Sequence, residues 1–423
     1  MMTDMDEIIR AKDVPERMQL RRGIQADRVL TDDEIEEEAY WVTTQMNHHR
    51  KGVDQQHFLD VNVKYVLKFM SQELLEVPFI ETHRRDYFTN VAGQKLTELL
   101  SRDDLWYIYD MDLKFRSFLE RRESLKALVE KLNINDSYLS EHIERVTKLE
   151  ELGDIFDYVN LRFAKQIDKA KAFKRPGSGG TYDLAKREQL AGFIKLLDVD
   201  APKFGKCVEE SRNISFPDDP QADPKVAAQD YVTDTGGFNS PDRVITLAMN
   251  MCSQEIAVDP VVRKQIRSKF DNAACVTVTP TEKGTGVIDE LHPYYPFKRL
   301  NQKYVRDFHD GQFLQILQAQ SEGLVKFEIK IPSEAEYLKS VADFMLSDGT
   351  SETTEKWNDL RRKIVTTALK DQVLVLLERS MTEQLRSQAE EWVAKKCQVA
   401  LEEVAFINHS KAHHNALMQR AKH

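Results

Sequence analysis

DDLWYIYDMDLKFRSFLERRESLKALVEKL, which runs from Asp103 to Leu132, contains no glycine or proline. Its apolar residues recur at the spacing of one helix face, so the stretch predicts a single long helix with a buried stripe. The expected stripe comprises Leu105, Ile108, Phe115, Leu119 and Leu125, broadened by Trp106, Tyr109 and Leu113. Such a stripe is typical of a helical core rather than of a base-stacking platform.

The composition of the whole chain agrees with a mainly α fold. Its 423 residues include only 16 glycines and 13 prolines, too few for a sandwich, barrel or propeller that turns every ten residues or so. Hydrophobic residues make up 41% and charged residues 31%, which is enough apolar surface for a sizeable core. The length predicts two or three compact units.

The segment before the long helix predicts a pair of helices that resembles a helix-turn-helix. Thr31 and Glu34 stand at capping-box spacing, and the acidic helix that they open is either a solvated face or a surface for a basic partner such as a histone. A helix over 55–75 should end near Val77-Pro78. A short helix then brings His83, Arg84 and Arg85 together beside Tyr87, at the start of the second helix of the pair.

Two groups of basic residues are candidate phosphate contacts. In the long helix they are interleaved with acids, so ordinary surface ion pairs are the alternative interpretation. The second group precedes PGSGG, the expected main linker, where the alternative is the solubility of a loop edge. The group in the long helix consists of Lys114, Arg116, Arg121 and Arg122. The group before the linker consists of Arg162, Lys165, Lys169, Lys171, Lys174 and Arg175.

Beyond the linker the patterns predict helices, then a small α/β element, then a long helical spine. The expected helices cover 182–197, 202–211, 224–231 and 242–257. Strands are expected over 275–279 and 326–331, with a helix between them that Gly323 stops. From Glu355 to Gln419 there is no glycine or proline, and Trp357 to Val393 repeat apolar residues at three- and four-residue steps.

Motifs for catalysis, metals and cofactors are not evident, so we expect a protein that is not an enzyme and holds no cofactor. The chain shows no P-loop, dinucleotide fingerprint, nucleophile elbow or zincin helix. The pairs His48-His49 and His413-His414 are adjacent residues, which point about 100° apart on a helix and suit a metal poorly. Four widely spaced cysteines suggest neither zinc nor disulfides, and reduced thiols in an intracellular compartment fit best.

Charge and hydropathy limit the classes of protein to which the chain can belong. A net charge of −10 argues against wholesale coating of a polyanion, although 60 Lys and Arg can still gather locally. No run of eighteen apolar residues and no signal peptide is present, so neither secretion nor a membrane partner is expected.

Several long strings resemble one family, in its order along the chain. They are DVPERMQLR (13–21), EVPFIETHRRDYF (76–88), DLWYIYDMDLKFRSFLERRESL (104–125), AQDYV (228–232), VTPTEKGTGVIDELHPYYPFKRL (278–300) and DGQFLQILQAQSEGLVKFEIKI (310–331). The family is the eukaryotic transcription elongation factor and histone chaperone called suppressor of Ty six, which is related to the bacterial Tex proteins.

The resemblance implies a nuclear protein that travels with the RNA polymerase II elongation complex and binds DNA, histones and nucleosomes. It implies no catalytic activity, because the family's nuclease-like domain is regarded as degenerate. At the positions that match the family, the resemblance implies phosphate contacts by Arg84, Arg85, Lys114, Arg121 and Arg122.

The same resemblance suggests how the chain is divided. We expect an amino-terminal segment (1–25), a helix-turn-helix domain (26–175), a helical region (176–274), the α/β element (275–332) and the spine (333–423). The family's acidic tail, with the motif for its helical-repeat elongation partner, and its carboxy-terminal domains find no match, so a fragment or truncated gene model is expected and contact with that partner is doubtful.

The sequence is compatible with three functions. The first is a non-enzymatic elongation-factor core that contacts DNA, histones or polymerase. The second is a structural brace for the carboxy-terminal domains, without nucleic-acid binding of its own. The third, an unrecognised hydrolase, is disfavoured because no concerted set of acid, base or metal ligands is visible.

Overall fold

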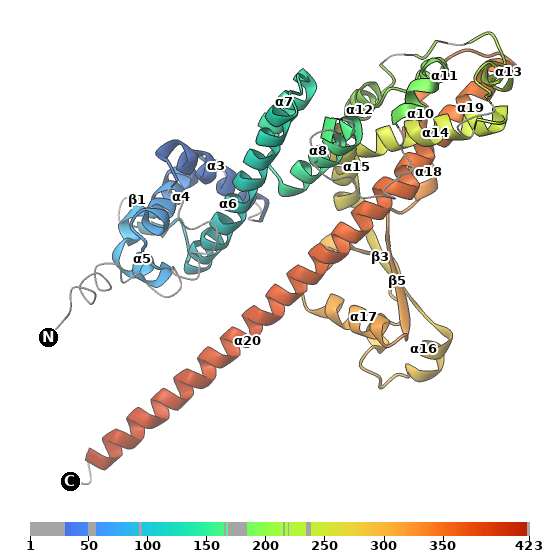
Figure 1. Ribbon diagram of the computed structural model, residues 1–423. Helices are drawn as coiled ribbons and strands as arrows, with labels where there is room; N and C mark the ends of the chain where they lie inside the picture. The colour runs from blue at the N-terminus through green and yellow to red at the C-terminus, as the bar shows by residue number, and fades with distance from the viewer. Residues whose placement is uncertain are drawn as a thin grey trace. The chain divides into compact units, whose positions relative to one another are not determined.

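The computed structural model describes residues 30–49, 56–92, 95–164, 166–167, 184–214, 216–218, 220–233 and 238–420. Helices dominate these residues and a small sheet is set among them, which confirms the predicted mainly α fold (Figure 1). The chain divides into two compact units, Met1–Gly153 and Asp154–His423. The predicted linker over 176–180 and the string DVPERMQLR lie outside the described residues.

The first unit opens with two helices that pack against each other, α3 (Asp32–His49) and α4 (Gln56–Ser71). The capping box of α3 is confirmed, since the Thr31 N–H donates to Glu34 Oε2 (2.9 Å) and the Glu34 N–H to Thr31 Oγ1 (3.3 Å). The predicted end of α4 near Pro78 is wrong. The helix ends at Ser71 and Leu74 takes a left-handed φ of 54°, whereas Pro78 lies in the first turn of the next helix, where its missing N–H costs nothing.

A short helix and a hairpin follow. They are α5 (Val77–His83), the 3₁₀ turn η1 (Arg85–Tyr87), and strands β1 (Thr89–Ala92) and β2 (Lys95–Glu98), which pair antiparallel with Thr89 opposite Glu98. The His83–Arg85 cluster was expected at the start of the second helix and lies at its end instead, because that helix already begins at Val77.

Helix α6 (Arg102–Lys131) is the predicted long helix. A capping box begins it, with the Ser101 N–H donating to Asp104 Oδ2 (2.7 Å) and the Asp104 N–H to Ser101 Oγ (3.3 Å). The five predicted stripe residues are all buried. Leu113 was expected beside them and is exposed, since it stands two residues before Phe115 and therefore about 200° round the helix.

Packing on α6 completes the first unit. The Trp41 ring of α3 lies 5.5 Å from the Phe115 ring and 6.3 Å from the Phe118 ring, and its Nε1 donates to the carbonyl of Thr147. Helix α7 (Ser137–Arg145) follows, and the boundary between the units falls within α8 (Leu149–Arg162).

The second unit begins as a layer of short and medium helices. Helices are present at all four predicted places. The one expected over 182–197 is broken at Leu190 into two. The helices are α10 (Leu184–Gln189), α11 (Ala191–Leu197), α12 (Ala201–Glu210), α13 (Pro224–Gln229), α14 (Pro241–Val258) and α15 (Pro260–Ala273). Asp259 begins α15 by accepting the N–H groups of Val261 and Val262, both at 3.0 Å.

The small α/β element is confirmed. Its antiparallel strands are β3 (Cys275–Pro280), β4 (Lys303–Tyr304) and β5 (Val325–Lys330), in the order β4-β3-β5, with Val276 opposite Ile329. Helices α16 (Glu282–Val287) and α17 (Gln312–Ser321) and the turns η2 (Tyr295–Phe297) and η3 (Val305–Asp307) complete it. Gly323, at φ +71°, stops α17 as expected.

The predicted spine is confirmed as one helical run. After α18 (Glu334–Ala342) and η4 (Asp343–Met345), helix α19 (Glu352–Ala368) passes through the π-turn η5 (Leu369–Val373) into α20 (Leu374–Arg420). Its buried side chains extend to Ala389, whereas Trp392 and Val393, which the pattern included, are substantially exposed. Among the helices of the described ranges, none is long and apolar enough to cross a membrane.

Buried polar groups of α19 hold the end of α11 and the loop that follows α12. The guanidinium of Arg361, fully buried, donates to the carbonyls of Leu197 (3.0 Å) and Asp218 (3.2 Å). Trp357 Nε1 donates to the carbonyl of Ala222 (3.0 Å). These bonds satisfy the side-chain donors of Arg361 and Trp357, which burial would otherwise leave unpaired.

Candidate nucleic-acid interface

Lys114 and Arg121 lie on one exposed face of α6. They are seven residues apart, close to two helical turns, so their side chains leave the helix in nearly the same direction. Both residues are exposed, and neither has an ion-pair partner among the residues that the structure describes. Within the described part of the chain, these two cations are therefore available to a phosphate.

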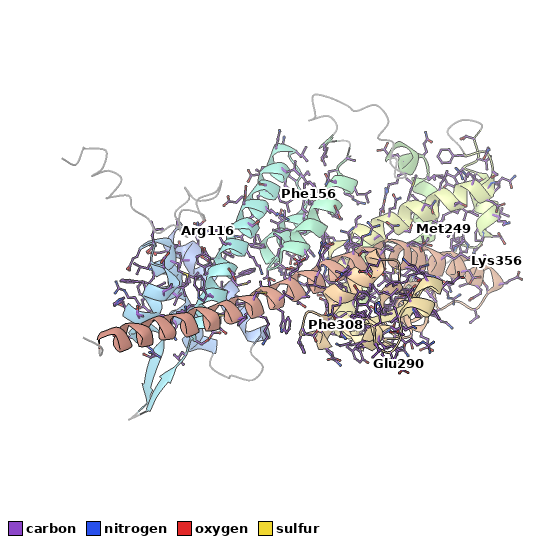
Figure 2. All side chains as sticks on the ribbon, turned by 90° about the horizontal axis from the view of Figure 1, so that it is seen from below. Arg116, Phe156, Met249, Glu290, Phe308 and Lys356 are labelled. Atoms are coloured by element: carbon purple, nitrogen blue, oxygen red, sulfur yellow. The ribbon has the colours of Figure 1, made fainter. Side chains whose placement is uncertain are left out.

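Arg122 and Arg116 on the same helix are held within the protein. Arg122 donates to both carboxylate oxygens of Glu37 (2.5 and 3.1 Å), its guanidinium lies 5.3 Å over the Phe118 ring, and its side chain is only 16% exposed. Arg116, labelled in Figure 2, donates to Asp112 Oδ1 at 2.9 Å. A phosphate at Arg122 would have to displace a bidentate carboxylate.

Arg84 and Arg85 follow directly after α5. The Arg84 guanidinium lies 5.5 Å from the Phe69 ring centre and 5.8 Å from that of Phe79, with Glu73 Oε2 at 3.6 Å. Arg85 is exposed at the first position of η1. Arg84 is thus engaged in cation–π contacts, and the assignment of both arginines as phosphate contacts stays a prediction.

The sequence patterns missed the aromatic surroundings of this cluster. Val61 and Tyr65 lie in the helix that the sequence predicts over 55–75, and both are exposed. Phe79 and Tyr87 are exposed too. Their spacing on two helices and a 3₁₀ turn shows no single period, so nothing in the linear pattern could have grouped them.

Most of the basic segment before the linker lies outside the described residues. Lys165, Lys169, Lys171, Lys174 and Arg175 lie outside the described residues, and Arg162, the last residue of α8, is exposed. Their assignment as nucleic-acid contacts stays a prediction.

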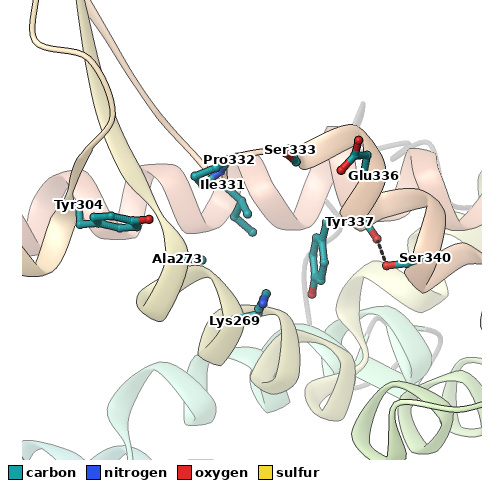
Figure 3. Close-up of a pocket in the computed structure, with 9 residues that line it drawn as sticks. All are labelled: Lys269, Ala273, Tyr304, Ile331, Pro332, Ser333, Glu336, Tyr337 and Ser340. Atoms are coloured by element: carbon teal, nitrogen blue, oxygen red, sulfur yellow. Dashed lines mark hydrogen bonds between the residues drawn. The ribbon is translucent and has the colours of Figure 1, made fainter.

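A pocket of about 480 Å³ lies in the second unit, between α15 and α18 (Figure 3). Tyr304 and Tyr337 stand at opposite sides of it, and Lys269 Nζ lies 6.0 Å from the Tyr337 ring. Burial raises the pKa of Tyr337 to about 12, so its phenol stays protonated at neutral pH. The lining residues are Lys269, Ala273, Tyr304, Ile331, Pro332, Ser333, Glu336, Tyr337 and Ser340.

Titratable groups elsewhere do not form a metal site in the described part of the chain, where no group of three His, Cys, Asp or Glu converges. Cys207, Cys252 and Cys275 are buried and Cys397 is exposed. Burial raises the pKa of the Cys252 thiol to about 12, which makes it a poor nucleophile.

Comparison with known proteins matches both units to one family. A family model described as the helix-turn-helix DNA-binding domain of SPT6 matches residues 27–137, and one described as Tex central region-like matches residues 219–396. The first span contains Arg84, Arg85, Lys114, Arg121 and Arg122. The chain belongs to the Spt6 family.

Curated relatives agree with this assignment. The chain is 32% identical to transcription elongation factor spt6 of Schizosaccharomyces pombe, over 94% of the chain and 30% of that protein. It is 30% identical to the proteins of the same name in Gibberella zeae and Aspergillus fumigatus, over 94% and 95% of the chain. The chain thus spans 30% of the length of these Spt6 relatives.

Proposed function

We propose that this chain is a non-enzymatic core of a nuclear transcription elongation factor that binds duplex DNA through its first unit. The exposed pair Lys114 and Arg121 carries the proposal, because it lies in the span that matches a DNA-binding helix-turn-helix domain. A face with two cations suits the duplex backbone, which is recognised mainly through charge.

The relatives' name supports the wider context of this binding. They are named transcription elongation factors, so we infer that the DNA met by this chain is transcribed chromatin. Binding of histones and nucleosomes, and support for RNA polymerase II as it passes through them, complete the proposal. In the acidic first turn of α3, Asp32 is paired with Lys68 and Glu34 caps the helix, whereas the exposed Asp33 offers charge complementary to a basic histone tail.

The test is duplex binding by the double variant Lys114→Glu, Arg121→Glu. Losing two phosphate contacts should weaken binding at least tenfold near physiological salt and flatten the slope of log affinity against log salt by about 2. Fluorescence anisotropy with a labelled duplex at several salt concentrations measures both quantities.

A matched control is Lys126→Glu. Lys126 is exposed on α6 but lies five residues beyond Arg121, about 140° round the helix from it. This variant should bind duplex nearly as the wild type does. Equal losses in the control and the double variant, or no loss in either, would remove the assignment.

A structural brace is the second candidate. The continuous run from α19 through η5 to α20 favours it, since that run packs against α14, α17, α18 and β5. Absence of both duplex and nucleosome binding at physiological salt, together with docking to the carboxy-terminal part of an Spt6 relative, would favour the brace over the DNA-binding core.

A further inference from the structure

A row of half-exposed aromatic rings runs from α4 across η1 to α5. The Tyr65 and Tyr87 ring centres lie 5.1 Å apart, and the Tyr87 ring meets the buried Phe69 ring edge-on at 4.9 Å. Arg84 bridges Phe69 to Phe79 through its two cation–π contacts. We define the aromatic row as Tyr65, Phe79, Arg84 and Tyr87.

The three outer rings of the row are unusually open. Tyr65 is 42%, Phe79 42% and Tyr87 44% exposed, and Val61, one turn before Tyr65, is 47% exposed. Single exposed apolar residues are ordinary, but a contiguous group marks a binding surface. Packing between the described helices of the unit therefore does not explain why these rings are exposed.

The chemistry of the row favours unpaired bases. Rings that are 42% to 44% exposed and lie beside a guanidinium are the kind of groups on which proteins stack the bases of single strands. In a duplex the base faces are covered by neighbouring base pairs, so these rings would gain nothing from it.

The charges around the row fit a ligand held mainly by stacking. Arg85 is exposed directly before Asp86 and Tyr87. The half-buried Arg84 has its guanidinium 3.6 Å from Glu73 Oε2. Lys64 and Lys68 on α4 are engaged by Glu36 (2.8 Å) and Asp32 (2.9 Å). Arg84 lies beside the rings and Arg85 follows it in sequence, so their charges can meet the adjoining phosphates.

We propose that the aromatic row binds unpaired bases of single-stranded nucleic acid, with Arg84 and Arg85 on the adjoining phosphates. The inference rests on the proposed function, because it assumes that the first unit binds nucleic acid. It adds a second ligand state, the unpaired strand, to the duplex assigned to Lys114 and Arg121.

The test compares a labelled oligothymidine of about 20 nucleotides with a duplex of equal length, using the full chain. Tyr65→Leu, Tyr87→Leu should weaken single-strand binding about tenfold or more, because two stacking rings are lost. Duplex binding should stay unchanged. Because two cations are involved, the wild-type slope of log affinity against log salt should be shallow, about −1.4.

Two controls separate stacking from damage to the fold. Tyr65→Phe, Tyr87→Phe keeps both rings and should keep single-strand binding. Tyr40→Leu removes an exposed tyrosine of α3 in the same unit and should also leave it unchanged. Photo-crosslinking of an oligonucleotide containing 5-iodouracil should label Tyr65 or Tyr87, a readout that a loss of stability does not mimic.

Each result decides one of the two proposals. Duplex binding that depends on Lys114 and Arg121, with single-strand binding indifferent to the leucine variant and no crosslink to the row, overturns this inference alone and leaves the rings to a protein partner. Failure to bind either ligand overturns the proposed function as well. A tenfold single-strand loss with intact duplex binding and a crosslink to the row supports it.

Discussion

The arginines of this protein differ in role according to what each side chain touches. Arg361 is buried and donates to backbone carbonyls, and Arg122 clamps α6 to Glu37 of α3. Arg121, its neighbour in sequence, faces solvent. One residue along a helix is a rotation of about 100°, so adjacent arginines serve the core and the surface respectively.

The phenol of Tyr337 should make the stability of the protein depend on pH in the alkaline range. Its pKa is raised by burial from the usual 10.0 to about 12, so between these values the unfolded chain loses the phenol proton while the folded protein keeps it. The stability contributed by Tyr337 is thus complete below about pH 10 and is lost as the pH rises towards about 12. Tyr337→Phe should therefore lose stability less steeply than the wild type over this range.

Urea unfolding at several alkaline pH values measures the difference. If the free energy of unfolding falls equally with pH in the wild type and in Tyr337→Phe, the pKa of the phenol is the same in the folded and unfolded chain, which would contradict the prediction.

Elements in the small α/β region depend on close backbone approach. A Cβ added to Gly284 of α16 would lie 1.8 Å from the carbonyl oxygen of Leu324, at the start of β5. That oxygen also accepts the N–H of Thr281 (3.0 Å), the cap of α16. The glycine therefore lets α16 lie against the end of the β3–β5 pair.

This contact predicts opposite effects for two neighbouring glycines. Gly284→Ala should destabilise the protein by about 1–3 kcal/mol, because the methyl group overlaps a backbone atom that cannot rotate away. Gly286→Ala meets nothing within 4 Å and should be neutral or stabilising by up to about 1 kcal/mol. Equal unfolding midpoints in urea for the two variants would contradict the close approach.

The whole molecule is built from two units with separate cores. The main apolar cluster of the second unit runs from Leu190 to Ala389 and contains no residue of the first. The first unit has its own core around Phe115, Phe118 and Trp41. The five-part division that the sequence suggested stays a prediction.

Separate cores predict separate responses to damage. Phe115→Ala should destabilise the first unit by about 3–5 kcal/mol, because a fully buried ring is lost. Hydrogen exchange followed by mass spectrometry should then speed up across α3 to α6, with α14 and α19 unchanged. Faster exchange in α14 and α19 to the same degree would show one cooperative molecule instead.

The sequence predicted those features that depend on short-range order. The stripe of α6, the capping box at Thr31, the stop at Gly323 and the strand predicted over 275–279 follow from spacing or local backbone preference. The structure confirms each of them, with the strand one residue longer. Family strings of the same kind located the helix-turn-helix region. The boundary near Pro78 was wrong, since proline suits the first turn of a helix as well as the end of one.

Tertiary structure decided which charged and aromatic groups face outwards. Periodicity counts Tyr65 as apolar and Arg122 as a surface cation, yet the tyrosine is open and the arginine is held by Glu37, which lies 85 residues earlier. The aromatic row likewise joins residues of α4, α5 and η1. The amino-acid sequence by itself therefore determined the helices and their family, because these depend on neighbours in the chain, whereas the candidate interface depends on contacts between distant segments that only the folded chain brings together.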